Sequence, residues 1–175
     1  IYTSPLSRCV ESAHILSGGR IPVEILEELR EIGMGEWEGL TFEEIRSRYP
    51  AAYWERGLDM ARFCLPGGES FVSCQQRALR ALEKIRAEGN GPVVVLAHAG
   101  INRALISWKE NRPLENLLQI PQGYGSVYTW EEPVFAGLIV AAGFSSRMGS
   151  FKPLMELDGQ KVIEREIATL RQGGV

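Results

Sequence analysis

The sequence lacks the features of a membrane, secreted or metal-binding protein. No apolar run approaches the ~20 residues of a membrane-spanning helix, and no basic region followed by an apolar stretch indicates a signal peptide. There are 3 cysteines without a CxxC spacing, and neither of the 2 histidines stands at ligand spacing from a cysteine. We therefore expect no metal site, and we expect Cys9, Cys64 and Cys74 to be buried free thiols in a reducing cytoplasm.

The sequence also has no excess of positive charge. Lysine and arginine total 19 against 22 aspartates and glutamates, which gives a formal net charge of -3. This balance offers no electrostatic reason to expect nucleic acid or a membrane as partner. The hydrophobic fraction of 45% is ordinary for a globular protein.

Candidate strands alternate with candidate helices, which favours an α/β fold of three layers, a sheet with helices on both faces. Residues 93–97 are apolar throughout, as in a strand buried on both faces of a parallel sheet. Ser4 and Pro5 are expected as N-cap and first residue of a helix that Gly18 ends. The other expected elements are strands at 1–3, 21–25, 127–130 and 138–142, helices at 41–48 (with a capping box), 70–88, 99–108 and about 161–172, and a loop at 49–66.

Two strand ends carry side chains that suit a phosphate. Arg8 lies beside the free N–H groups of the first expected helix, and His98 follows a wholly apolar strand at the start of another helix. In an open α/β sheet such strand ends meet at one edge, so both residues could bind an anion there. The alternatives are that Arg8 is a solvated surface charge and that His98 is a satisfied core histidine.

A third element is a glycine-punctuated stretch with Glu31, Glu36 and Glu38. One of these carboxyl groups could act as a general acid for a leaving alcohol. Spacing alone does not say which one, and each taken singly could be a solvated charge.

Four ordered motifs together resemble the histidine phosphatase (phosphoglycerate mutase-like) superfamily, nearest to its alpha-ribazole phosphatase branch. They are Ser4-Pro5-Leu6-Ser7-Arg8, the stretch from Leu29 to Gly39, Pro66-Gly67-Gly68-Glu69-Ser70, and Val94 to Gly100. The resemblance covers about residues 1–130, and we expect the domain at 1–133. It implies that Arg8 clamps phosphate, that His98 is the second active-site histidine, and that Glu31 donates a proton to the leaving group. It also implies that Glu36 and Glu38 are structural, that hydrolysis passes through a phosphohistidine, and that no cofactor is needed.

The motif that carries the nucleophile of that family, Arg-His-Gly, is missing from this sequence, and His14 lies in the middle of a helix pattern. The sequence begins with Ile1 rather than Met, in what reads as a strand. We expect a phosphatase domain without its first strand, and negligible turnover by this segment alone.

A second set of candidate functional residues lies in a glycine- and serine-rich loop that follows the apolar strand at 138–142. Its small residues would let backbone amides approach a nucleotide, while Arg147 and Lys152 would neutralise phosphates. It lacks the Walker and dinucleotide motifs.

This loop resembles the signature of nucleotidyltransferases that act in molybdenum-cofactor synthesis. The resemblance covers residues 137–175, the start of a Rossmann-like domain, and implies an NTP as partner and Mg²⁺ for a complete domain. The nucleotide contacts that it implies are Ala141, Ala142, Gly143, Ser146, Arg147, Gly149 and Lys152.

Three hypotheses follow. The parent protein is a bifunctional phosphatase and nucleotidyltransferase, or a nucleotidyltransferase with a degenerate phosphate-binding module, or this segment only binds anions. The substrate class that fits is a phosphorylated small molecule. The residues expected to line the pocket opening are Tyr53, Trp54, Arg56, Arg62 and Phe63.

Overall fold

A computed structural model describes residues 1–88, 91–130, 137–140, 156–157 and 160–161. Its strands are β1 (Tyr2–Thr3), β2 (Glu24–Ile25), β3 (Val94–Ala97), β4 (Val127–Tyr128), β5 (Gly137–Val140), β6 (Glu156–Leu157) and β7 (Gln160–Lys161). Its α-helices are α1 (Ser7–Ser17), α2 (Phe42–Arg48), α3 (Pro50–Leu58), α4 (Phe71–Glu88) and α5 (Ala99–Lys109). Short 3-10 helices η1 (Glu27–Leu29), η2 (Gly35–Trp37) and η3 (Leu114–Gln119) complete the set.

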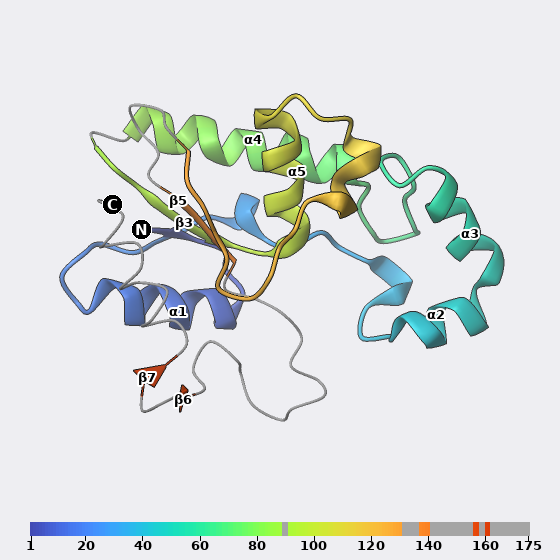
Figure 1. Ribbon diagram of the computed structural model, residues 1–175, viewed down its shortest axis with the longest axis horizontal. Coiled ribbons are helices and arrows are strands. Elements are labelled where there is room, and N and C mark those ends of the chain that lie inside the picture. Colours follow the sequence, from blue (N-terminus) through green and yellow to red (C-terminus); the bar gives the residue numbers. More distant parts are fainter. Residues whose placement is uncertain (89–90, 131–136, 141–155, 158–159, 162–175) are drawn as a thin grey trace.

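The main sheet has the strand order β2-β1-β3-β5-β4, in which only β4 runs antiparallel to its neighbour. Helix α1 covers one face of this sheet, and α4 and α5 cover the other (Figure 1). The predicted layered α/β fold is therefore present. Strand β5 pairs with both β3 and β4, so the backbone at 137–140 lies in the same sheet as the first region, while the proposed domain boundary stays a prediction.

Strand β3 is buried on both faces, as predicted, because successive side chains of a strand point to opposite sides. Val95 and Ala97 pack in a core with α4 and α5, whereas Leu96 packs with Cys9 and Ala13 of α1. Each of these three β3 residues is 0% exposed. The carboxyl end of β3 is thereby fixed between two helical layers.

Helices α2 and α3 form a lobe (residues 42–58) that stands apart from the sheet (Figure 1). The predicted capping box starts α2: Thr41 Oγ1 accepts from Glu44 N at 3.2 Å, and Glu44 Oε2 accepts from Thr41 N at 2.9 Å. The expectation of a loop at 49–66 is wrong, because α3 follows with Pro50 at its first position. Helix α3 has no buried residue, and Trp54 and Leu58 are exposed at its surface.

Other boundaries also differ from expectation. Helix α1 begins at Ser7 with Leu6 at the N-cap, so Ser4 is not its cap, although Gly18 ends it as predicted with φ 54°. The strand expected at 21–25 is reduced to β2, and Lys161 lies in β7 rather than starting a helix. The rest of that predicted helix lies outside the described residues.

Two further expectations concern cysteine and membranes. Cys9 and Cys74 are buried free thiols, but Cys64 is exposed, which corrects the prediction for that residue. In the part of the chain that the structure describes, no helix has the length and apolarity to cross a bilayer.

Candidate functional site

The turn after β1 places Ser4 and Arg8 against the end of β3. Ser4 N donates to Leu96 O at 3.0 Å, which ties the two strand ends together. Ser4 is 0% exposed, and its Oγ accepts from Leu6 N at 3.3 Å. Arg8 follows in the first turn of α1, with its side chain directed along the carboxyl edge of the sheet to His98.

His98 stands at the N-cap of α5, directly after β3, and is 0% exposed. Its Nδ1 lies 3.2 Å from Arg8 Nη2, and its Nε2 lies 2.6 Å from Ser4 Oγ. Burial, followed by the positive charges of Arg8 and Arg77, lowers the pKa of His98 from 6.5 to about 3. His98 is therefore neutral in this structure, and we call the cluster of Ser4, Arg8 and His98 the Arg8–His98 site.

Glu31 is held at the start of the same helix. Its carboxylate accepts from Ile32 N at 3.0 Å and from Gly100 N and Ile101 N, both at 3.1 Å. Burial raises the pKa of Glu31, while these three backbone donors oppose the rise. A Cβ at position 100 would lie 2.5 Å from Glu31 Oε1, so a larger residue there would displace the Glu31 carboxylate.

The loop that carries Glu31 is anchored by Arg77 of α4, which the sequence gave no reason to single out. Arg77 donates to Glu28 O at 2.7 Å, within η1, and to Arg30 O at 2.8 Å, directly after it. It also forms a two-fold ion pair with Glu69, at 3.0 and 2.6 Å. The position of Glu31 beside α5 thus depends on a partly buried arginine network.

The other candidates lie outside this arrangement. Glu36 is exposed, and Glu38 Oε1 accepts from Met34 N at 2.8 Å, so Glu38 closes a turn. His14 is exposed in the middle of α1. Cys9, which was not predicted, packs its Sγ 3.5 Å from His98 Nε2. The seven predicted nucleotide contacts between Ala141 and Lys152 lie outside the described residues.

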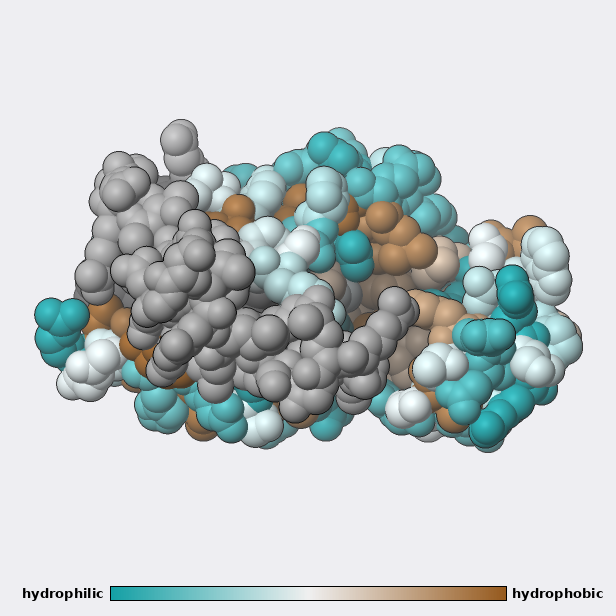
Figure 2. Space-filling model, turned by 60° about the horizontal axis from the view of Figure 1, so that its bottom comes forward, coloured by the Kyte–Doolittle hydropathy of each residue, from teal (hydrophilic) through white to brown (hydrophobic). Residues whose placement is uncertain are grey.

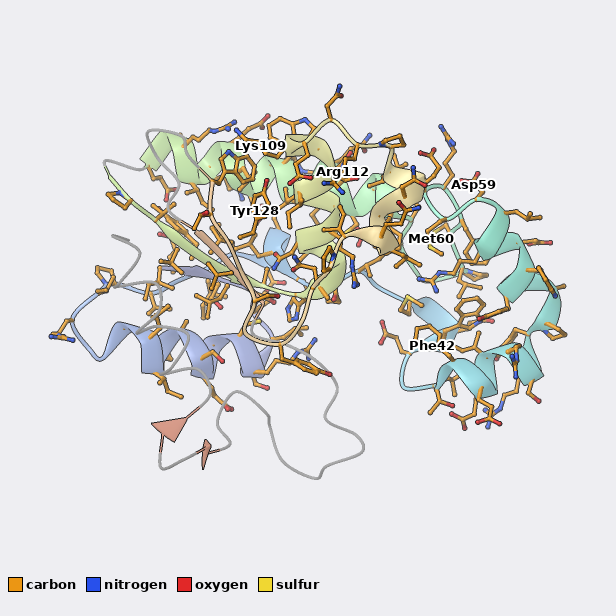
Figure 3. The ribbon with its side chains drawn as sticks, in the orientation of Figure 1. Phe42, Asp59, Met60, Lys109, Arg112 and Tyr128 are labelled. Atoms are coloured by element: carbon orange, nitrogen blue, oxygen red, sulfur yellow. The ribbon has the colours of Figure 1, made fainter. Side chains whose placement is uncertain are left out.

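A small pocket lies beside Glu31 and is lined from Ile32 and Gly33 onward. Trp37 and Phe63 line it with ring centroids 5.7 Å apart, and Arg56 lies 5.8 Å above the Trp37 ring. Figure 2 shows apolar surface between the lobe and the central body, and in Figure 3 Met60, which also lines the pocket, lies where the lobe meets that body. Of the residues predicted to line the opening, Arg56 and Phe63 do so, whereas Trp54 is 73% exposed and Arg62 is exposed.

Among the described residues, no group of three histidine, cysteine, aspartate or glutamate side chains is placed to hold a metal ion. The site combines the guanidinium of Arg8 and the imidazole of His98 with the carboxyl group of Glu31 beside them. Such a set can hold an anion and supply a proton.

A family model of the histidine phosphatase superfamily (branch 1) matches residues 1–132. The chain belongs to the histidine phosphatase superfamily. A second model, of the MobA-like NTP transferase domain, matches residues 137–175. This second match falls almost wholly outside the described residues.

Among curated proteins, histidine phosphatase relatives include two bifunctional enzymes named 6-phosphofructo-2-kinase/fructose-2,6-bisphosphatase. The one from Arabidopsis thaliana is 36% identical over 123 residues, covering 69% of this chain and 16% of its own length. The one from Gallus gallus is 32% identical over 117 residues, covering 67% of this chain and 24% of its own length. The chain thus spans less than a quarter of these relatives.

Solved phosphatase structures share the fold. Bacillus stearothermophilus YhfR has a TM-score of 0.65 at 32% identity, covering 77% of this chain and 70% of its own. A mycobacterial glucosyl-3-phosphoglycerate phosphatase complexed with inorganic phosphate has a TM-score of 0.64 at 27% identity, covering 81% and 76%. The alpha-ribazole phosphatase of Shigella flexneri, at 24% identity and a TM-score of 0.60 over 81% of this chain and 72% of its own, supports the fold alone.

Proposed function

We propose that this chain supplies most of the active site of a phosphomonoesterase that works through a phosphohistidine. The observation that carries the proposal is the meeting of Arg8 with His98 at 3.2 Å, across 90 residues of sequence, at the carboxyl edge of the sheet. A guanidinium and an imidazole at that edge form a cradle for a phosphoryl group. Membership of the histidine phosphatase superfamily supports the same chemistry.

In the proposed reaction, Arg8 and His98 bind the phosphoryl oxygens while a histidine from outside this sequence attacks phosphorus. The bond from phosphorus to the leaving oxygen breaks, and Glu31 gives that oxygen its proton. Burial raises the pKa of Glu31, which favours the protonated form that such an acid requires. Water then hydrolyses the phosphohistidine and restores the proton to Glu31.

We further propose that the pocket beside Glu31 receives the leaving group. Arg56 contacts the Trp37 ring there, and no ion pair of Arg56 with a carboxylate occurs among the described residues. A half-buried guanidinium of this kind favours a leaving group that carries a negative charge of its own. The relatives named as fructose-2,6-bisphosphatases fit this substrate class, because their substrate keeps a second phosphate.

The test is an assay of this chain beside the longer product of its parent gene, with p-nitrophenyl phosphate as substrate. We expect negligible turnover from the chain alone and turnover from a longer product that contains Arg-His-Gly, lost by about a thousandfold in its His98→Ala variant. Turnover by the chain alone that His98→Ala abolishes and the upstream segment leaves unchanged would contradict the proposal.

The match of residues 137–175 to an NTP transferase model favours a second candidate. In it, the parent protein transfers nucleotides with Mg²⁺, and the Arg8–His98 site only binds phosphate. Sequencing the gene upstream of the codon for Ile1 separates the two, since a strand without Arg-His-Gly would leave the chemistry to the nucleotidyltransferase.

A further inference from the structure

Both ring nitrogens of His98 already have partners within the chain. Nδ1 faces Arg8 Nη2 at 3.2 Å, and Nε2 faces Ser4 Oγ at 2.6 Å. A guanidinium can only donate hydrogen bonds, so Nδ1 must be the acceptor and carries no proton. The single proton of the neutral ring therefore sits on Nε2 and is donated to Ser4 Oγ.

Ser4 is well placed to accept that proton and to keep the ring from turning. It is 0% exposed, its backbone N is bonded to Leu96 O at 3.0 Å, and its Oγ also accepts from Leu6 N at 3.3 Å. The backbone of Ser4 is thus fixed by Leu96, and its hydroxyl is fixed by Leu6 N. A ring held at Nε2 in this way keeps Nδ1 on the side of Arg8.

The neutral ring presents a difficulty for an anion at Arg8. The lone pair of Nδ1 would face the anion's oxygen atoms, and two acceptors repel each other. An anion beside Nδ1 also offsets the charge of Arg8, which is one of the groups that keep His98 unprotonated. Both effects favour a proton on Nδ1 once the anion is bound.

We propose that Ser4 is a positioning residue for anion binding, whose hydroxyl holds Nε2–H of His98 so that Nδ1 takes up one proton as the anion binds. The inference rests on the proposed anion site at Arg8 and His98. The proton comes from solvent and no covalent bond in the protein breaks. When the anion binds, the contact between Arg8 and Nδ1 of His98 is replaced by two hydrogen bonds to the anion, one from Arg8 and one from His98.

The other groups around His98 limit where the proton can go. Cys9 of α1 donates its thiol to Ala97 O at 3.5 Å, and burial raises its pKa to about 12, so it stays a neutral thiol. Arg77 of α4 carries a fixed positive charge. In the described chain, Glu31 is the one other group near His98 that could take up a proton. Its carboxylate lies at the start of α5, and burial raises its pKa.

Sulfate is the probe for the test, since it does not titrate near neutral pH. We expect its affinity for the chain, measured by isothermal titration calorimetry, to increase about tenfold for each unit that pH decreases between about 8 and about 6. In ¹⁵N NMR spectra, the free chain should show His98 protonated at Nε2 only, and the sulfate-bound chain should show it protonated at both nitrogens.

The variant that tests Ser4 is Ser4→Ala. Loss of the Ser4 hydroxyl destabilises the charged His98 ring of the sulfate-bound chain more than the neutral ring of the free chain. Sulfate should therefore bind about tenfold more weakly, and its affinity should depend less steeply on pH. Ser4→Thr, which keeps the hydroxyl, should restore both. The matched control is Ser12→Ala, because Ser12 is equally buried but bonds Arg8 O at 2.8 Å and not His98.

Distinct results would overturn distinct statements. Sulfate binding without a pH slope, or a free ring protonated at Nδ1, refutes the inference and leaves the anion site standing. Unchanged affinity and slope in Ser4→Ala refute the role of Ser4. A slope that Glu31→Gln removes, with the His98 spectrum unaltered on binding, assigns the proton to Glu31 instead. Absence of sulfate binding refutes the proposed function itself.

Discussion

The Arg8–His98 site and the α2–α3 lobe differ in how the fold holds their functional side chains. Ser4 and His98 are 0% exposed and sit where strands β1 and β3 end between two helical layers. On the lobe, Phe42 is 68%, Trp54 73% and Leu58 84% exposed, and Arg56 lines an open pocket. The proposed phosphate site is thus fixed by the core, while the surface proposed to select the leaving group can change with little effect on the core.

The largest expected effect tests this difference in stability. Leu82→Ala, in α4 at 1% exposure, should lower the free energy of unfolding by about 2–5 kcal/mol, because it leaves a cavity in the core that also contains Val95 and Ala97. Leu58→Ala, the matched change on the lobe, should change it by less than about 0.5 kcal/mol. Urea denaturation of both variants measures the contrast, and equal losses would show that the lobe is packed as tightly as the core.

The next test uses pH. The contributions of His98 and Glu31 to folding stability should change with pH in opposite directions. The folded chain keeps His98 neutral down to about pH 3, whereas the unfolded chain protonates it below 6.5, so its contribution makes stability fall as pH decreases between these values. The pKa of Glu31 is raised above 4.5, so its contribution makes stability fall as pH rises above that value.

The measurement is urea denaturation across pH for His98→Asn and Glu31→Gln, each compared with the wild-type chain. His98→Asn should remove the loss of stability at acid pH, and Glu31→Gln should remove the loss of stability above pH 4.5. His14→Asn, on the exposed side of α1, is the control for His98. Profiles parallel to wild type would mean that neither group is perturbed by folding.

The smallest expected effect concerns the lobe alone. In an active longer product, Arg56→Leu should raise KM for a bisphosphate about tenfold and leave KM for p-nitrophenyl phosphate within about twofold, because only the first substrate has a second charge to bind. Arg62→Leu, an exposed arginine that follows α3, is the matched control. An equal rise for both substrates would place Arg56 at the phosphoryl group rather than at the leaving group.

Local patterns in the sequence predicted the layered fold because its core elements have clear periodicity. The all-apolar β3, the stripe of α4 and the capping box of α2 each depend on neighbouring residues. Helix α3 was missed because its stretch was interpreted as an aromatic loop. Pro50 at its first position was the available signal, and it was outweighed by the aromatic residues of that stretch.

The sequence predicted which residues belong to the site better than it predicted the contacts between them. Arg8, Glu31 and His98 could be selected because motifs place them at strand and helix ends, and the structure brings them to one edge. The contact of Ser4 with His98 joins residues 94 apart, so no local pattern carries it. Ser4 resembled an N-cap, but α1 begins only at Ser7 with Leu6 at its N-cap, and the Ser4 hydroxyl faces the imidazole instead.

The position of β5 bears on how the protein is made. This strand lies between β3 and β4 in the sheet, yet it comes after both in the sequence. During synthesis on the ribosome, the two strands that flank it emerge before residues 137–140 do, with unpaired edges facing each other. A nascent chain paused before this point would be the form most prone to aggregate and the one on which a chaperone would act.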